Sequence, residues 1–284
     1  MIIWLASYPK SGNTWIRSII AALMCTHDGI FNFNLLKNVD QFPQKKFLKN
    51  FTNDFGNFNE IKKYWEDSQD FINLDNKIKF LKTHHINCKI GPYNFTSKKN
   101  TLATIYIVRD PRNLVNSISN HYSLTLEESK NFLFTPKFIG GYRKNNDSIN
   151  DSLKDLLGTW DEHYKFWKNN NKDYLLIKYE NLIKDTRFEL ERIIEFIKKY
   201  TDVKTNENKN ENIIKTTNFK FLKNLEEKGY FNENAYENIN KKKKFFNLGP
   251  ENNWKNLLDK KTMNEIETKF STEMKELGYL KLNV

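Results

Sequence analysis

A short segment near the start of the chain combines residue types that bind anions. It follows the apolar run Ile2–Ala6 and precedes apolar residues at helical spacing, so it should link a buried strand to a helix. The segment reads Tyr8-Pro9-Lys10-Ser11-Gly12-Asn13-Thr14-Trp15. Backbone N–H groups at such a loop bind anions, and Lys10 adds a positive charge while Thr14 adds a hydroxyl donor. We predict a phosphate-binding loop here, although one such turn alone can be a plain strand–helix connection.

This loop differs from the loop of nucleoside triphosphatases. The motif of those enzymes, GxxxxGK[ST], needs a glycine five residues before a Gly-Lys pair. Lys10 precedes Gly12 here, so the motif and its magnesium-binding hydroxyl are out of frame. The two cysteines, Cys25 and Cys88, belong to no Cys/His cluster, which argues against a zinc site. We therefore expect no metal.

Other apolar runs also end in residues that could do chemistry. The run Lys79–Thr83 leads into His84, whose imidazole can take a proton near neutral pH. Thr101–Val108 leads into Arg109, whose planar guanidinium suits a phosphate dianion. Each residue has an ordinary alternative as well, either a histidine bonded in the core or an arginine paired with a surface carboxylate. His85 adjoins His84 and would point to the opposite side of an extended chain.

The elements that must position these residues predict an α/β fold. The runs Ile2–Ala6, Lys79–Thr83, Thr101–Val108 and Tyr174–Lys178 are typical of strands and are separated by helical patterns. Such alternation favours three layers, with helices on both faces of a central, mainly parallel sheet. Ligands of such sheets bind beyond the carboxyl ends of the strands, where the residues above stand. Because the strands span both halves of the chain, we expect a single domain over residues 1–284.

Several helices are expected between and after these strands. Asp110-Pro111 is a good N-cap and first-turn pair, so a helix should begin there. Apolar spacing predicts further helices over Leu153–Trp167, Phe188–Ile197 and Met263–Leu277. The polar tract Thr201–Asn212 predicts a surface loop instead.

The composition fits an anionic ligand without choosing one. Of 284 residues, 46 are Lys or Arg and 35 are Asp or Glu, so the formal net charge is +11. An anionic partner and solvated loop lysines both account for this excess. The longest apolar run, around Ile19–Cys25, is far shorter than the roughly 20 residues of a membrane span, and no secretory signal is recognisable. We expect a cytoplasmic protein of a reducing compartment.

Taken in order, the motifs resemble those of the cytosolic-type sulfotransferases, which transfer the sulfuryl group of 3′-phosphoadenosine 5′-phosphosulfate (PAPS) to a hydroxyl or amine. Residues 8–15 are similar to the family loop YPKSGTTW, with Asn13 in place of one Thr. The tripeptide ending in His84 resembles the family's Lys-Thr-His. Arg109, with Ser117 eight residues on, resembles its pair for the 3′-phosphate. Tyr179-Glu180 and the segment Thr217-Asn218-Phe219-Lys220 resemble its adenine-binding elements, so the resemblance implies a P-loop-like sulfotransferase fold.

The resemblance also implies a role for each of these residues. His84 would be the general base, Lys10 would neutralise charge on the leaving 5′-phosphate, and Lys82 would stabilise the sulfuryl oxygens. The implied nucleotide-binding residues are Lys10, Ser11, Gly12, Asn13, Thr14, Trp15, Arg109, Ser117, Tyr179, Thr217, Phe219 and Gly249. Among them Trp15 and Phe219 would stack on the purine. The implied donor is PAPS and its product is 3′-phosphoadenosine 5′-phosphate (PAP), with no metal.

The last motif of the family, Arg-Lys-Gly followed by Gly-Asp-Trp-Lys, is altered here. Gly249 and Trp254 keep their places, but Asn247 and Leu248 stand where the basic pair that covers the 3′-phosphate belongs. The upstream run Lys241–Lys244 can take over that role or can form a solvated loop. The family's dimerisation segment is not recognisable after Trp254, so the oligomeric state stays open.

Two other function classes stay open at this point. A P-loop kinase or nucleotide-binding protein needs a Walker-type loop and a magnesium-holding carboxylate, and neither is recognisable. A basic nucleic-acid-binding module needs basic and aromatic residues on one exposed surface, and only Lys241–Phe246 hints at this, so no nucleic acid is expected. The expected acceptor is a small molecule, or a carbohydrate or glycolipid head group. Phe31–Tyr64, His85–Tyr93 and His121–Tyr142 are interpreted as its pocket or lid.

Overall fold

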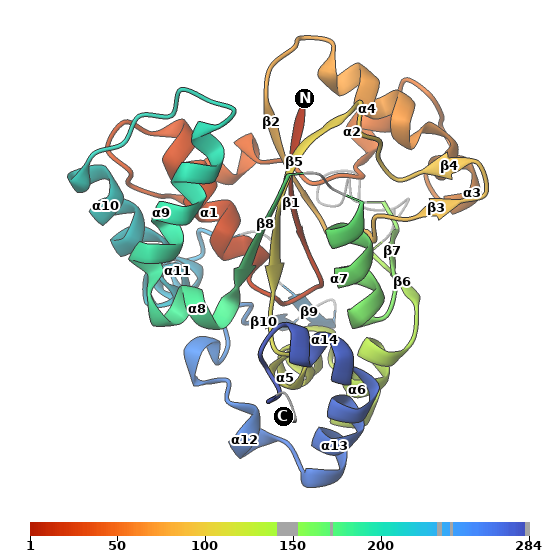
Figure 1. Cartoon of the computed structure of the whole chain (residues 1–284), viewed down its shortest axis with the longest axis vertical. Helices are drawn as coiled ribbons and strands as arrows, with labels where there is room; N and C mark the ends of the chain where they lie inside the picture. The colour runs from red at the N-terminus through yellow and green to blue at the C-terminus, as the bar shows by residue number, and fades with distance from the viewer. Residues whose placement is uncertain (141–152, 171–172, 232–234, 239–240, 282–284) are drawn as a thin grey trace.

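The structure, a computed structural model, describes residues 1–140, 153–170, 173–231, 235–238 and 241–281. Its centre is a sheet of four parallel strands in the order β2-β1-β5-β8. The strands are β1 (Ile2–Ser7), β2 (Lys79–Thr83), β5 (Thr101–Val108) and β8 (Tyr174–Lys178). All four predicted strands are therefore confirmed, and their carboxyl ends meet at the lower edge of the sheet in Figure 1.

Side chains of β1 alternate between two hydrophobic layers, one on each face of the sheet. Leu5 packs in the layer that holds α1 (Asn13–Cys25) and α9 (Thr186–Lys198), on the left in Figure 1. Trp4 packs in the opposite layer, which holds α7 (Trp160–Asn169). Adjacent strand residues point to opposite faces, so one strand serves both layers. The predicted α/β architecture of three layers is confirmed.

Helix α5 (Pro111–Tyr122) begins directly after β5, as the Asp110-Pro111 pair predicts. The side chain of Asp110 accepts the backbone N–H of Arg112, and Pro111 occupies the first turn. The C-terminal helix α13 (Lys260–Lys269) contacts α5 below the sheet, and α14 (Ser271–Glu276) packs on α13 (Figure 1). The end of the chain thus returns to the edge where the strands finish.

The helix predicted over Leu153–Trp167 is correct only from Trp160 onward. Asp155–Leu157 instead forms β7, which pairs with the antiparallel strand β6 (Lys137–Ile139). A capping box starts α7: Oγ1 of Thr159 accepts the backbone N–H of Glu162 (3.4 Å), and the Glu162 carboxylate accepts the backbone N–H of Thr159 (2.8 Å). The apolar residues Leu156 and Leu157 before this capping box therefore belong to a strand and not to the helix.

Three further predictions need correction. The loop predicted over Thr201–Asn212 is helical in its second half, because Asn206 caps α10 (Glu207–Thr217). Phe188, predicted on the apolar face of α9, is 56% exposed. The single helix predicted over Met263–Leu277 is divided at Phe270 into α13 and α14.

The other elements are short and lie mainly in the connections between the strands. They are η1 (Phe33–Asn38), α2 (Lys45–Leu48), α3 (Phe58–Ile61), η2 (Lys62–Tyr64), α4 (Trp65–Asn73), β3 (Lys89–Ile90), β4 (Tyr93–Asn94), α6 (Leu126–Phe134), α8 (Tyr179–Lys184), α11 (Phe219–Glu227), β9 (Ala235–Asn238), β10 (Lys241–Lys243), η3 (Gly249–Glu251) and α12 (Trp254–Leu257). None of the helices in the described ranges has the length and apolar character that crossing a bilayer demands. The same ranges contain no group of three His, Cys, Asp or Glu side chains arranged to hold a metal ion.

Candidate functional site

The loop between β1 and α1 packs so closely that it needs a glycine. Gly12 has a φ of 103°, and a Cβ atom there would lie 2.7 Å from Cδ2 of Tyr179. Asn13 fastens the loop to the strand, because its Nδ2 donates to the carbonyl oxygen of Leu5 (2.9 Å) and to Oγ of Ser7 (3.1 Å). The N-terminus of α1, whose first N–H groups have no acceptor within the helix, is thereby held at the carboxyl edge of the sheet.

Polar atoms without partners gather around this loop. Lys10 Nζ, Ser11 Oγ, Trp15 Nε1 and Arg109 Nε are buried, and within the described part of the chain they have no hydrogen-bond partner. All but the serine hydroxyl can act only as donors. Leaving one buried polar group unpaired costs about 1–3 kcal/mol, so such groups normally have a partner. Their clustering fits a site whose partner is an anionic ligand.

The ammonium group of Lys10 lies in an electropositive and poorly solvated place. Burial lowers the pKa of Lys10 to about 7, and the charges of Arg109 and Lys82 add to this, whereas Glu226 acts weakly in the opposite direction. Its Nζ lies 3.5 Å from the centre of the Phe245 ring, where the face of the ring attracts a cation. A bound anion would supply the counter-charge and raise this pKa again.

Arg109 joins the loop to two other predicted motifs. It is 5% exposed, and its Nη1 donates to the carbonyl oxygen of Lys10 (3.2 Å) and to Oγ of Ser117 (3.1 Å). Its guanidinium carbon lies 4.1 Å from the centre of the Tyr179 ring, which Trp15 meets edge to face at 5.9 Å. Lys10, Trp15, Arg109, Ser117 and Tyr179, predicted from separate segments, therefore share one cluster.

The remaining predicted nucleotide-binding residues lie around a group of phenylalanines. Gly249 (φ 54°) packs on Phe219 so tightly that a Cβ atom would lie 2.4 Å from the ring. Phe246 lies between Phe219 (centroids 6.0 Å apart) and the Phe245 ring beneath the Lys10 ammonium (5.1 Å). Thr217 is fully buried, and its hydroxyl donates to a carbonyl of its own helix (2.8 Å). The single hydroxyl hydrogen of Thr217 is therefore bonded within α10 and is not directed at a ligand.

His84 follows β2 and is half-buried at the same edge of the sheet. Its Nδ1 lies 2.8 Å from the carbonyl oxygen of Ser7, which can only accept, so Nδ1 carries the hydrogen and Nε2 is left to accept a proton. Ser7 Oγ lies 3.4 Å from the same Nδ1 and also accepts from Asn13, which links the imidazole to the phosphate loop. Burial, with a contribution from Lys82, lowers the pKa of His84 well below its ordinary value, so the ring is neutral.

The other two histidines near this edge have different surroundings. His85 is fully buried and stacks on Phe95, with ring centroids 4.2 Å apart, so it belongs to the core. His163 was not predicted, although its place on the apolar face of α7 was a signal. Its Nε2 donates to the carbonyl oxygen of His84 (3.0 Å), and its Nδ1 accepts from the Tyr106 hydroxyl (2.8 Å). Because burial lowers its pKa to about 4, His163 stays neutral and supports the backbone of His84.

Asp155, which sequence reasoning did not anticipate, lies within electrostatic reach of the predicted Lys82. Asp155 is 2% exposed, and burial raises its pKa to about 8 although the charge of Lys82 acts against this shift. Lys82 is 9% exposed, and its backbone pairs with residues of the preceding connection, accepting from Phe42 N (2.9 Å) and donating to Asp40 O (2.7 Å). No pattern marked Asp155, because it was placed within an expected helix.

The segment that replaces the family's basic pair contributes no cation at its own two positions. Asn247 is exposed and Leu248 is half-buried. Lys244, at the end of the upstream basic run, forms an exposed ion pair with Glu227 at 2.9 Å. The side chains of Lys241–Lys243 lie outside the described part of the structure.

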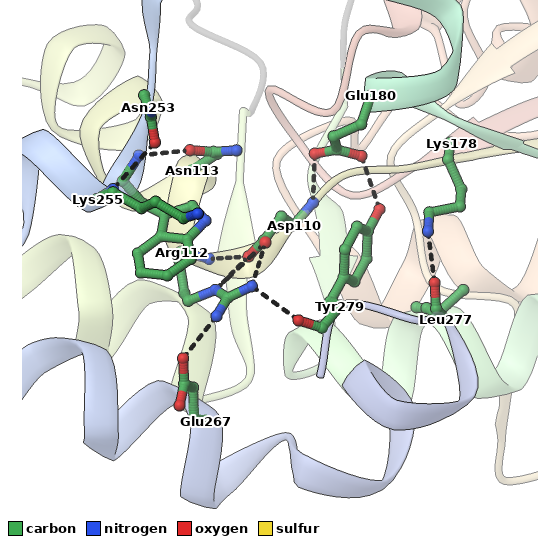
Figure 2. A network of polar contacts seen from close by, with 11 residues as sticks. Asp110, Arg112, Asn113, Lys178, Glu180, Asn253, Lys255, Glu267, Leu277 and Tyr279 are labelled. Carbon is green, nitrogen blue, oxygen red and sulfur yellow. Dashed lines mark hydrogen bonds and ion pairs between the residues drawn. The ribbon is translucent and has the colours of Figure 1, made fainter. Parts of the chain in front are cut away.

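A network of ion pairs and hydrogen bonds, also not predicted, connects the C-terminus to the start of α5. Figure 2 shows Arg112 between Asp110, Glu267 and the backbone of Tyr279. Its Nη2 lies 2.6 Å from Asp110 and 3.0 Å from the Tyr279 carbonyl oxygen, and its Nη1 lies 2.5 Å from Glu267. Glu180 accepts the Asp110 N–H (3.0 Å) and the Tyr279 hydroxyl (2.8 Å), so β5, β8 and the C-terminal helices are held together beside Arg109.

Comparisons with known proteins identify the family of this chain. The family model described as a sulfotransferase domain matches residues 2–278. A 3-alpha-hydroxysteroid sulfotransferase of Cavia porcellus is 25% identical over 76% of this chain and 64% of its own length, so the chain spans just under two thirds of that relative. Sulfotransferase 1E1 of Mus musculus is 26% identical, with 96% of this chain and 83% of that protein covered.

Solved structures share the fold. A mouse sulfotransferase, SULT7A1, complexed with PAP has a TM-score of 0.57 at 20% identity, covering 96% of this chain and 83% of that one. A retinol dehydratase in complex with retinol and PAP has a TM-score of 0.59 at 16% identity, covering 100% of this chain and 83% of that one. At these identities the likeness shows the fold alone.

Proposed function

The chain belongs to the sulfotransferase family, and on that premise we propose that it transfers the sulfuryl group of PAPS to a hydroxyl or amine acceptor. The observation that carries the proposal is the cluster of buried donors without partners at the loop: Lys10, Ser11, Trp15 and Arg109. A phosphate-bearing ligand offers acceptor oxygens to such donors and a counter-charge to Lys10 and Arg109. The kinase and nucleic-acid alternatives are not favoured, because the family model and the curated relatives are sulfotransferases.

The residues present fit such a donor nucleotide. Lys10 and the first N–H groups of α1 would hold the 5′-phosphate side, and Arg109 and Ser117 would hold the 3′-phosphate. Trp15 and Tyr179 would contact the purine. When bound, PAPS supplies the sulfuryl group and departs as PAP. Lys10 is placed to neutralise the charge that grows on the departing phosphate, and this is a task of positioning and electrostatics.

His84 is proposed as the general base toward the acceptor. Its Nδ1–H is held by the Ser7 carbonyl, so Nε2 can take the proton of the acceptor hydroxyl. The lowered pKa keeps this imidazole neutral at physiological pH, which is the protonation state that a base needs. Lys82, whose charge acts on His84, Lys10 and Asp155, is proposed to stabilise the sulfuryl oxygens.

We propose a small-molecule acceptor that carries a hydroxyl group. Support comes from the names of relatives, which include steroid sulfotransferases and a flavonol 4′-sulfotransferase of Flaveria chlorifolia. A carbohydrate or glycolipid acceptor, a single domain over residues 1–284 and a cytoplasmic location stay predictions, and the oligomeric state stays open.

Ligand-dependent thermal stabilisation tests the nucleotide site directly. A ligand at 100 times its dissociation constant adds about 2.7 kcal/mol, so PAP should raise the melting temperature of the wild type while ATP with magnesium should not. The Arg109→Ala variant should lose the response, and Arg187→Ala, which changes an exposed arginine paired with Glu207, should keep it. Stabilisation by ATP with magnesium but not by PAP would overturn the proposal.

Transfer of radiolabelled sulfate from PAPS to a panel of phenols and steroids tests the reaction itself. We expect product with the wild type and a turnover lowered about 10²-fold or more in His84→Ala, with PAP binding retained. Full transfer activity in His84→Ala would contradict the assignment of the base.

A further inference from the structure

Asn252 connects the altered last motif to the cluster around Arg109. It follows η3 and is 5% exposed. Its Nδ2 donates to the carbonyl oxygen of Asn113 (2.8 Å) and to Oγ of Ser117 (2.9 Å), both on α5. Two residues later the backbone N–H of Trp254 donates to Oδ1 of Asn113 (2.8 Å), so this segment is fastened to α5 on both sides of Asn253.

The orientation of the Asn252 amide follows from its partners. The carbonyl oxygen of Asn113 has no hydrogen to give, so the amide must turn its NH₂ group toward it. The same NH₂ group therefore also faces Ser117. Arg109 Nη1 donates to the same Ser117 oxygen at 3.1 Å. The serine hydroxyl thus receives two hydrogen bonds, one from a cation and one from an amide.

This arrangement decides what Ser117 can do. A hydroxyl has two acceptor sites and one hydrogen, and Arg109 and Asn252 occupy both acceptor sites. The hydroxyl hydrogen is then left to donate to a further acceptor. A phosphate oxygen next to the guanidinium of Arg109 would be such an acceptor.

We propose that Asn252 is a positioning residue for 3′-phosphate recognition, which it serves by committing the Ser117 hydroxyl to donate toward the phosphate. The inference rests on the proposed function, because it assumes that the ligand is PAPS or PAP. The segment has Asn247 and Leu248 at the positions of the family's basic pair. It would still contribute to phosphate binding, because the buried amide of Asn252 orients the Ser117 hydroxyl. Asn252 does not itself touch the ligand.

The test compares two nucleotides that differ by the 3′-phosphate. Dissociation constants for PAP and for adenosine 5′-monophosphate are measured by calorimetry with the full chain. In Asn252→Ala we expect the affinity for PAP to fall about tenfold, the size of one hydrogen bond to a charged group, and the affinity for adenosine 5′-monophosphate to stay within about twofold. Asn256→Ala, which changes an exposed asparagine of α12, is the matched control and should change neither.

A double-mutant cycle separates positioning from a direct contact. Ser117→Ala should weaken PAP binding about as much as Asn252→Ala, and the double variant should lose no more than Ser117→Ala alone, because Asn252 acts through that hydroxyl. Asn252→Asp keeps the size of the side chain but replaces the donor with an acceptor, which draws the Ser117 hydrogen to itself. We expect a loss of PAP affinity larger than that of Asn252→Ala, with adenosine 5′-monophosphate affected less.

The outcomes are distinguishable. Equal losses for both nucleotides in Asn252→Ala, or additive losses in the double variant, would overturn the positioning role while the proposed function stands. A wild type that binds the two nucleotides equally but transfers sulfate would also overturn it, because no 3′-phosphate site would then exist. A wild type that neither binds PAP nor transfers sulfate would overturn the proposed function and this inference together.

Discussion

Arg109 and Arg112 stand three residues apart at the start of α5, and each is 5% exposed, yet their surroundings differ. Arg112 meets Asp110, Glu267 and the Tyr279 carbonyl oxygen (Figure 2). Its guanidinium carbon also lies 3.8 Å from the centre of the Trp254 ring. Arg109 meets neutral groups only: a carbonyl oxygen, a hydroxyl and an aromatic ring. Across the described ranges it forms no ion pair.

A buried charge is costly unless it is paired, so the two arginines cannot serve the same purpose. Arg112 has its counter-charges within the fold and holds the C-terminal helices to the sheet. Arg109 has hydrogen bonds that orient it, but no carboxylate in the described part of the chain forms an ion pair with it. The comparison teaches that, of two equally buried arginines, the one without an internal counter-charge is the one kept for an anionic ligand.

The largest expected effect concerns the fold. Arg112→Ala leaves the buried carboxylate of Asp110 without its partner, and breaking such a pair costs about 3–5 kcal/mol of unfolding free energy. Urea denaturation should show this loss, with Arg187→Ala changing stability by less than about 1 kcal/mol. An unchanged unfolding midpoint would mean that the network in Figure 2 is not structural.

The next effect concerns catalysis. Lys10→Ala removes the cation that is proposed to neutralise the leaving phosphate, and it should lower turnover about 10²-fold or more, which is about 2.7 kcal/mol in the barrier. Stability should not fall in parallel, because the ammonium group is buried without a hydrogen-bond partner among the described residues. Single-turnover kinetics at saturating PAPS and urea denaturation measure the two quantities. A loss of stability with full turnover would mean that Lys10 has a structural role like that of Arg112 and not a ligand-binding role like that of Arg109.

Arg109→Ala sharpens the comparison directly. We expect the affinity for PAP to fall about tenfold to hundredfold, or about 1.5–3 kcal/mol, because a hydrogen-bonded charge on the phosphate is lost. The unfolding free energy should stay constant or rise, since an unneutralised buried charge is removed. Calorimetry and denaturation should show opposite results for the two variants. Arg109→Ala should lose affinity for PAP and keep its stability, whereas Arg112→Ala should lose stability. Two variants with the same pattern would remove the distinction between the two sites.

The smallest effect is a pH dependence of binding. With a pKa of about 7, Lys10 is mostly neutral in the free protein above pH 7, and a bound phosphate raises that pKa. Binding then takes up a proton, so the affinity for PAP should fall by up to about tenfold per pH unit as the pH rises above 7. Calorimetry in two buffers of different ionisation enthalpy reports the proton taken up. No uptake at pH 8, or uptake retained in Lys10→Ala, would contradict this assignment.

Much of the architecture could be predicted because its signals are local. Each of the four strands is a continuous apolar run, and parallel strands bring their carboxyl ends to one edge. Lys10, His84, Arg109 and Tyr179 could therefore be placed near one another without knowledge of the side-chain packing. The start of α7 was missed because a capping box at Thr159 overrides the apolar spacing before it.

The types and order of the chemical groups were determined by the amino-acid sequence alone: a loop that contains Lys10 and Gly12, cations at strand ends, and neutral residues in place of the basic pair. Only the tertiary structure decided which of those groups are neutralised. Arg112 and Glu267 are 155 residues apart, and Asn252 and Ser117 are 135 residues apart. The difference between Arg109 and Arg112 arises from such distant contacts, because burial and pairing depend on what the folded chain brings beside each charge.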